Sequence, residues 1–266
     1  MAIEKETDLD IETKNETKNE HDHAQAPVTI KNYRQAGIIF IILRWLVRLL
    51  LRAMFRIEVR GLENLPKEGG YIFAGNHLSW IDPFLMLAFA PATPRIYFIA
   101  AREDVEFPRW RRIFTEGVGG VIPVDRDKRS AFRDVSKQVS VVLHGGGVLG
   151  IYPEGDVSAI ETGRVLPLKK GIGYFAAHSG APIVPVGFSG TKELWLGKRI
   201  CMNIGQPIPG RKGGKDVAEA QTQATAAGLR AAILPPPEQN PRSRKLMRKF
   251  LTELFTQEEK EHPIPD

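Results

Sequence analysis

Cysteine is almost missing from this 266-residue sequence, since Cys201 is the only one. A single thiol cannot build a disulfide framework, and it excludes any metal site made of several cysteines. The six histidines do not fall at the spacings of metal ligands, and His21 and His23 lie in a strongly polar stretch. We therefore expect no bound metal and a reducing compartment.

Apolar side chains are scarce in residues 1–30, which are rich in Glu, Lys, Thr and Asn. Such a stretch cannot bury enough surface to offset the entropy of ordering, so we expect a disordered acidic tail. Because it lacks a positively charged start followed by an apolar run, we do not expect a signal peptide.

Acidic side chains are outnumbered in the rest of the chain. Residues 1–30 hold eight acidic and three basic side chains, a net of −5, which leaves +11 on the remainder of a chain whose total is +6. A basic body suits nucleic acid, an anionic membrane or anionic substrates. The basic patches lack the interleaved exposed aromatic residues typical of nucleic-acid binding, so we expect no nucleic-acid partner.

Residues 31–57 contain an apolar stretch, Gly37–Phe55, in which Arg44, Arg48 and Arg52 recur every fourth residue. In a helix these arginines form one stripe beside an apolar face. A spanning helix is disfavoured, because about a dozen apolar residues gain roughly 4–7 kcal/mol and three central arginines cost roughly 7–10. We expect a peripheral or monotopic helix on the cytoplasmic face of the membrane, with its arginines at the headgroups. A helix packed on the protein's own core is the alternative.

Short β-favouring runs alternate with helical stretches over residues 58–235, which predicts an α/β domain with a mostly parallel central sheet covered by helices. The predicted strands are Tyr71–Ala74, Arg95–Ala100, Gly120–Val124, Val148–Tyr152, Ile183–Phe188 and Lys198–Ile208. The predicted helices are Ser130–His144, Ile172–Ser179 and Asp216–Leu234. The first of these helices sets Phe132, Val135, Val139 and Val142 on one apolar face.

Residues 236–266 begin with prolines and continue into a basic amphipathic stretch, Arg242–Phe255. The prolines predict a semi-rigid linker. The stretch after them sets apolar side chains against arginine and lysine, which predicts a second amphipathic helix. This helix could contact lipid or pack on the preceding domain.

The chain is organised around Tyr71–Phe84, where an apolar strand breaks at Gly75 and a new segment opens at Asp82-Pro83. Asp suits a helix N-cap and Pro the first helical position, so we expect a helix to begin there. His77 and Asp82 then share one strand-to-helix connection. A carboxylate bonded to one imidazole nitrogen fixes the tautomer and raises the basicity of the other nitrogen. The pair predicts a general base with its orienting partner; a surface histidine near a capping aspartate is the alternative.

Further polar residues follow other predicted strands. Arg126 is placed to contact a phosphate through both guanidinium nitrogens, unless it is a surface arginine beside Asp125. Glu154 and Gly155 supply a carboxylate and a close backbone approach to a ligand, with an ordinary Pro/Gly turn as the alternative. Residues 184–191 enter a Gly-Thr turn and serve mainly the core. In an open α/β sheet, such strand ends build a site along one edge.

Taken in order, these blocks resemble the 1-acylglycerol-3-phosphate acyltransferase family of lipid enzymes. That family carries N-H-x-x-x-x-D, G-x-I-x-[IV]-D-R, F-P-E-G-x-R-S and V-P-V-x-x-x-G-T, matched here by residues 76–82, 120–126, 152–158 and 184–191. The segment Leu166–Gly171 resembles the P-F-K-x-G that follows the third block. The resemblance covers residues 58–208. It departs from the family at Val157, where the family has an arginine associated with the phosphate of the acceptor.

The resemblance implies a fatty acyl transfer from acyl-CoA or acyl-carrier-protein to the hydroxyl of a lysophospholipid such as 1-acylglycerol-3-phosphate, in phospholipid biosynthesis and without a cofactor. It implies His77 and Asp82 as catalytic residues. Backbone N–H groups near Gly155 are our own candidates for donors to the oxyanion. The implied substrate-binding residues are Asn76, Arg126, Glu154, Gly155 and Lys169. Arg164, Lys169 or Lys170 are candidates to hold a phosphate in place of the family's arginine. The alternatives are an acyl-thioester or lysolipid hydrolase, an acyltransferase for a different lysolipid, and a non-catalytic lipid-binding protein.

Overall fold

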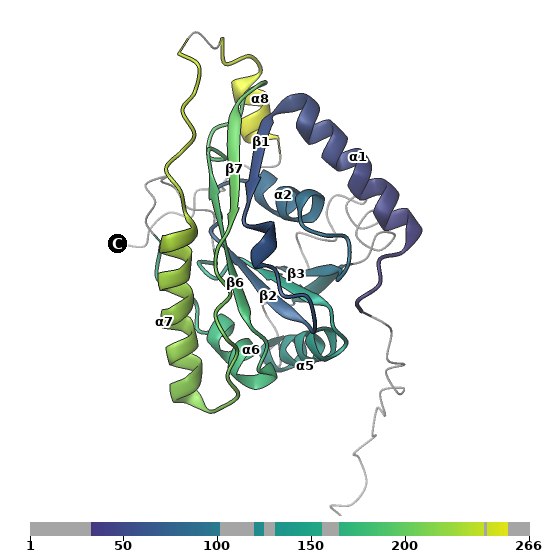
Figure 1. Ribbon diagram of the computed structural model, residues 1–266, viewed down its shortest axis with the longest axis vertical. Helices are drawn as coiled ribbons and strands as arrows, with labels where there is room; N and C mark the ends of the chain where they lie inside the picture. The colour runs from purple at the N-terminus through teal and green to yellow at the C-terminus, as the bar shows by residue number, and fades with distance from the viewer. Residues whose placement is uncertain (1–32, 102–119, 125–130, 156–164, 242–243, 255–266) are drawn as a thin grey trace, which may run out of the picture. The chain divides into compact units, whose positions relative to one another are not determined.

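The computed structural model describes residues 33–101, 120–124, 131–155, 165–241 and 244–254 (Figure 1). The expected acidic tail and the predicted site residue Arg126 lie outside these ranges, as does Val157. The helices are α1 (Ile38–Met54), the 3-10 helix η1 (Leu62–Asn64), α2 (Ile81–Phe89), α5 (Ala131–His144), α6 (Gly171–Ser179), α7 (Lys215–Ala232) and α8 (Arg248–Glu253).

The described residues form a seven-stranded sheet with the order β1-β7-β6-β2-β5-β3-β4. Its strands are β1 (Arg56–Arg60), β2 (Tyr71–Gly75), β3 (Ile96–Ala101), β4 (Val121–Val124), β5 (Val148–Ile151), β6 (Ile183–Ser189) and β7 (Arg199–Ile204). Neighbours in the sheet run parallel except β6 and β7. The mostly parallel sheet predicted from the sequence is therefore confirmed. The sequence does not predict β1, an edge strand whose charged side chains face outward.

The central strand β2 divides the core into two layers, because its side chains alternate between the two faces of the sheet. Tyr71 and Phe73 join the cluster of buried residues that includes Leu51 of α1 and Leu85 of α2. Ile72 and Ala74 join the second cluster, which includes residues of α5 and α6. Helix α7 packs against α6 and β6 on this second side (Figure 1). Every residue of β2 is buried, so the loop after it starts from a fixed point.

Helix α5 differs from its predicted face at one position. Val135, Val139 and Val142 are buried, but Phe132 is 51% exposed. Phe132 lies in the first turn, at the edge of the core. Its ring packs edge-to-face against the Tyr174 ring, with centroids 4.8 Å apart, and stacks on the buried ring of Phe175 at 5.9 Å.

Two helix boundaries also differ from prediction. Helix α2 begins at Ile81, so Asp82 lies in its first turn instead of capping it, and its carboxylate bonds backbone N–H groups of the preceding loop. Helix α8 is much shorter than the predicted Arg242–Phe255. Lys245 and Met247 have φ of 44° and 59°, which a right-handed helix cannot accommodate.

Helix α1 turns its arginine stripe toward the protein. The Arg44 guanidinium donates hydrogen bonds to the backbone oxygens of Leu87 and Ala90 at the end of α2, the first at 3.0 Å. The guanidinium carbon of Arg48 lies over the Phe89 ring, 5.3 Å from its centroid. Arg44 thus satisfies carbonyl groups that the end of a helix otherwise leaves unpaired.

The opposite side of α1 is apolar and exposed. Its exposed apolar side chains are Ile38, Ile39, Ile41, Ile42, Trp45, Leu46, Leu49 and Leu50. The expectation that the arginines reach lipid headgroups is therefore wrong for Arg44, whose hydrogen bonds are made within the protein. Over the described residues, no helix combines the length and apolar character needed to cross a membrane.

Candidate active site

His77 and Asp82 meet at the carboxyl end of β2. The Nδ1 atom of His77 lies 3.0 Å from Oδ2 of Asp82. That same oxygen accepts hydrogen bonds from the backbone N–H groups of Leu78 at 2.7 Å and Ser79 at 2.8 Å. The Asp82 side chain is fully buried, whereas 21% of the His77 side chain is exposed. The aspartate is therefore held by the loop that it orients.

This geometry assigns the two nitrogens of the imidazole different roles. With Nδ1–H donating to the carboxylate of Asp82, the lone pair of the neutral ring lies on Nε2. A carboxylate in this position fixes the ring and stabilises the imidazolium that forms when Nε2 accepts a proton. The pair can therefore act as a general base on a hydroxyl group or a water molecule.

The ring of Tyr152, which follows β5, stacks on the ring of His77. Their centroids are 4.3 Å apart and their planes differ by 21°. The hydroxyl of Tyr152 is buried and has no hydrogen-bond partner among the residues described. Burial raises the pKa of this hydroxyl well above its ordinary value, with a smaller contribution from the charge of Asp82. Sequence reasoning missed this stacking, although the third block places an aromatic residue at this position.

Asn76 joins the ends of two neighbouring strands. Its amide nitrogen donates to the backbone oxygen of Phe188 at 3.0 Å, and its amide oxygen accepts from the backbone N–H of Phe188 at 2.7 Å. The side chain is buried and both ends of its amide are engaged. Asn76 therefore fixes the start of the His77 loop to β6, which differs from the substrate contact expected of it.

Glu154 lies two residues beyond Tyr152 and is 6% exposed. Its Oε2 accepts a hydrogen bond of 3.3 Å from the backbone N–H of Leu166. Burial raises the pKa of Glu154, against the opposing effects of this N–H and of His77. Its Oε1 is buried without a hydrogen-bond partner in the described part of the chain. A carboxyl group is thus placed close enough to His77 to interact with it electrostatically.

Two of the predicted site residues, Gly155 and Lys169, lie in contact with each other. Gly155 has φ of +87°, and a Cβ on it would lie 2.1 Å from Cε of Lys169. The backbone N–H of Gly155 donates to the oxygen of Tyr152 at 3.1 Å. That N–H is consequently engaged within a turn, so the expectation that backbone N–H groups near Gly155 donate to the oxyanion stays a prediction for the N–H groups of its neighbours. The close approach that this glycine permits is to Lys169.

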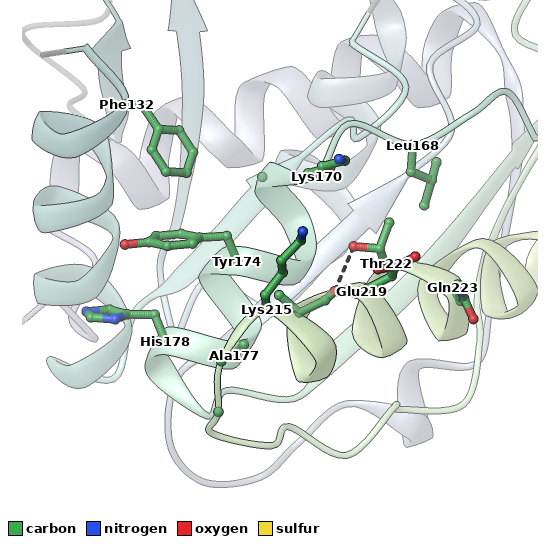
Figure 2. Close-up of a pocket in the computed structure, with 14 residues that line it drawn as sticks. Phe132, Leu168, Lys170, Tyr174, Ala177, His178, Lys215, Glu219, Thr222 and Gln223 are labelled. Atoms are coloured by element: carbon green, nitrogen blue, oxygen red, sulfur yellow. Dashed lines mark hydrogen bonds between the residues drawn. The ribbon is translucent and has the colours of Figure 1, made fainter. Parts of the chain in front are cut away.

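A cavity of about 580 Å³ lies between α6 and α7 (Figure 2). Tyr174 and His178 of α6 line one side of it, and Lys215 and Glu219 of α7 line the other. Lys170, one of the candidates to hold a phosphate, is among its lining residues, but His77, Asp82 and Glu154 are not, so we do not assign the cavity to catalysis. Over the described residues, no group of three or more His, Cys, Asp or Glu side chains gathers in a way that could hold a metal ion.

The family described as Acyltransferase matches residues 56–189, a range that runs from β1 to the end of β6 and contains His77, Asp82 and Glu154. The chain belongs to the Acyltransferase family. The matched acyltransferase region covers half of the chain and does not include α1, β7, α7 or α8.

Relatives of this acyltransferase carry a common description. The chain is 28% identical over 155 residues to the 1-acyl-sn-glycerol-3-phosphate acyltransferase of Bacillus subtilis, across 57% of this chain and 73% of that protein. It is 32% identical over 171 residues to the one from Borreliella burgdorferi, across 64% and 65%. Against that of Limnanthes alba it is 33% identical over 140 residues, 52% of this chain, and spans 47% of that longer protein.

A solved structure shares the fold of this acyltransferase. It is the 1-acyl-sn-glycerophosphate (LPA) acyltransferase PlsC of Thermotoga maritima, with a TM-score of 0.53 and 22% identity, covering 73% of this chain and 79% of that one. At this identity the likeness establishes the α/β fold.

Proposed function

We propose that this protein transfers a fatty acyl group from an acyl-CoA or acyl-carrier-protein thioester to the hydroxyl of a lysophospholipid such as 1-acylglycerol-3-phosphate. The observation that carries the proposal is the 3.0 Å contact between His77 and the buried Asp82 at the end of the central strand. Membership of the Acyltransferase family and the names of the relatives support the acceptor class. The reaction belongs to phospholipid biosynthesis.

The reaction needs one proton relay. Nε2 of His77 takes the proton of the acceptor hydroxyl while that oxygen attacks the thioester carbonyl, and Asp82 stabilises the resulting imidazolium. The tetrahedral intermediate then collapses: the carbon–sulfur bond breaks, and the imidazolium returns its proton to the departing thiolate. A new ester and a free thiol result, without a covalent enzyme intermediate and without a cofactor.

The remaining site residues fall into two roles. Tyr152 holds the imidazole plane through stacking, and Asn76 fixes the loop to β6. Arg126, Glu154 and Lys169 are the residues that we assign to acceptor binding, with Lys169 supplying a cation beside Gly155.

Association with the cytoplasmic face of a membrane completes the proposal. The exposed side of α1 presents apolar side chains such as Trp45, Leu49 and Leu50, each more than half exposed. A helix with this distribution lies in the interface with its apolar side among the acyl chains. Such a position delivers the enzyme to an acceptor and a product that are themselves lipids.

The test is an assay of the purified full chain with 1-acylglycerol-3-phosphate and other lysolipids, using one acyl-CoA and one acyl-carrier-protein donor. We expect a diacyl product whose formation requires the acceptor. Release of free fatty acid at the same rate with and without an acceptor would show a hydrolase, and a lack of turnover with every pair would overturn the proposal.

A further inference from the structure

The C-terminal segment, Arg244–Leu254, lies beyond the family match and has an unusual surface. Its exposed large apolar side chains are Leu246, Met247, Phe250 and Leu254. Its basic side chains, all on exposed residues, are Arg244, Lys245, Arg248 and Lys249, against the single acidic Glu253. Exposed apolar side chains interleaved with cations are the composition of a surface that meets an anionic bilayer.

This exposure does not come from a loose end of the chain. Leu251 is 1% exposed and belongs to the buried cluster under α1 and α2. The hydroxyl of Thr252 accepts a hydrogen bond of 3.0 Å from the backbone N–H of Leu194. Arg248 forms a 2.7 Å ion pair with Glu193. The segment is thus attached to the protein by one side, while its apolar side chains face outward on the other.

The segment also lies next to the end of α1 (Figure 1). The backbone N–H of Leu196 donates to the oxygen of Leu246 at 3.1 Å, and the next N–H, of Gly197, donates to the oxygen of Met54 at 2.7 Å. Two consecutive residues therefore join the C-terminal segment to the last residue of α1. The C-terminal segment and the last turn of α1 are therefore neighbours.

A hydrogen bond connects the segment to the candidate active site. Nε1–H of Trp80 donates to the backbone oxygen of Leu251 at 2.8 Å. Trp80 immediately precedes α2 and lies in the His77–Asp82 loop. A shift of the C-terminal segment would therefore also shift the end of this loop, where α2 begins.

We propose that the C-terminal segment is a second contact with an anionic lipid bilayer, which acts beside α1 and holds the His77–Asp82 loop at the bilayer surface. Leu246 and Phe250, 62% and 56% exposed, enter the acyl boundary. Lys249 extends to the headgroups, and Lys245, whose ammonium nitrogen lies 5.0 Å from the centroid of the Trp195 ring, adds its charge to the same surface. The inference rests on the proposed function for its meaning, because a membrane-bound acceptor is what makes such an orientation useful.

The test measures binding of the full chain to vesicles of phosphatidylcholine alone and with phosphatidylglycerol, by co-sedimentation. The double variant Leu246→Ser/Phe250→Ser should weaken binding to both kinds of vesicle by about 10-fold or more. The double variant Lys245→Gln/Lys249→Gln should weaken binding to the anionic vesicles alone, by about 10- to 30-fold.

Matched controls come from the other side of the sheet. Arg211→Gln/Lys212→Gln removes two exposed cations before α7, and Phe132→Ser removes an exposed aromatic ring of α5. These variants should bind both kinds of vesicle as the wild type does. Thermal unfolding verifies that each variant is folded.

Unchanged vesicle binding in both segment variants would overturn the inference. The inference would also be overturned if the wild type self-associates without lipid, as measured by light scattering, and the segment variants do not. The surface would then bind a second copy of the chain. Vesicle binding does not depend on catalysis. If the segment variants lose vesicle binding but the wild type transfers no acyl group, the proposed function is refuted and the inference about the segment stands. Acyl transfer to a short-chain, monomeric lysolipid should be unchanged in the segment variants.

Discussion

The ring of Tyr152 covers the ring of His77 at a centroid distance of 4.3 Å, and its hydroxyl has no hydrogen-bond partner in the described part of the chain. The ring and the hydroxyl therefore have separable effects. Tyr152→Phe should raise the free energy of unfolding by about 1 kcal/mol, since a buried hydroxyl without a partner costs about 1–3 kcal/mol. Tyr152→Leu should lower both stability and kcat, because the stacked ring is lost. Urea unfolding and steady-state kinetics of the two variants measure this. A large loss of kcat in Tyr152→Phe would show that the hydroxyl takes part in the reaction.

Removing the general base should stop transfer without unfolding the protein. His77→Ala should lower kcat by about 10²- to 10⁴-fold, the range typical of a positioned acid–base group. Asp82→Asn should be almost as damaging, because it removes the charge that stabilises the imidazolium. Circular dichroism and vesicle binding should match the wild type in His77→Ala. Near-normal turnover in that variant would contradict the mechanism.

Two kinds of change in α1 should separate folding from lipid binding. Arg44→Gln should lower the free energy of unfolding by about 1–3 kcal/mol, since it weakens hydrogen bonds to two backbone oxygens at the end of α2. Leu49→Ser/Leu50→Ser should leave stability unchanged and weaken vesicle binding, because these side chains are exposed in the free protein. Urea unfolding and co-sedimentation test both. The reverse pattern would show that the arginines, not the apolar side, meet the membrane.

Glu154 should make stability depend on pH. Its folded pKa lies above the ordinary value of 4.5, so the folded state holds the proton more tightly than the unfolded chain does. The stability that this tighter proton binding contributes is fully present below pH 4.5 and is lost as the pH rises through the folded pKa. Glu154→Gln should therefore be more stable than the wild type at neutral pH, with a difference that shrinks toward pH 4. Thermal unfolding of both proteins across this range measures it; a difference independent of pH would assign the effect to packing.

Val157 should affect the choice of acceptor. A charge-assisted hydrogen bond to a phosphate contributes about 1.5–3 kcal/mol, or roughly 10- to 150-fold in binding. Val157→Arg should lower the KM for 1-acylglycerol-3-phosphate by part of that factor. If Arg164, Lys169 or Lys170 already holds the phosphate, the variant should do little and removal of that residue should raise the KM. If 1-acylglycerol-3-phosphate is already the best acceptor and none of these changes alters its KM, Val157 does not influence which acceptor headgroup is bound.

The sequence predicts those features that depend on residues close to one another along the chain. The strands β2 to β6 are apolar runs ended by glycine or polar residues, and the His77–Asp82 loop follows from a spacing within one connection. The orientation of α1 could not be predicted in this way. Periodicity places Arg44 on a stripe of arginines along the helix. Only the tertiary contact with Leu87 shows that the arginine side of the helix, and not its apolar side, faces the protein.

Asn76 illustrates the same limit at the site. Its place next to His77 in the motif agrees equally with a substrate contact and with a structural one. The residue that decides between them, Phe188, lies on β6 and is brought near by sheet pairing, in which Gly75 is opposite Val186. Local pattern thus points to the residues that we propose to react, whereas the roles of their neighbours depend on contacts between distant parts of the chain.

The pairing of β1 with β7 has a consequence for the order in which the protein is made. Arg56 of β1 lies opposite Arg199 of β7, and among the strands that the structure describes β1 has no other neighbour. During translation, β1 therefore leaves the ribosome long before its partner strand β7 exists. Pairing of such distant segments is slow, and apolar surface exposed in the meantime favours aggregation. We expect the nascent helix α1 to meet either a chaperone or the bilayer before the catalytic domain has closed its sheet.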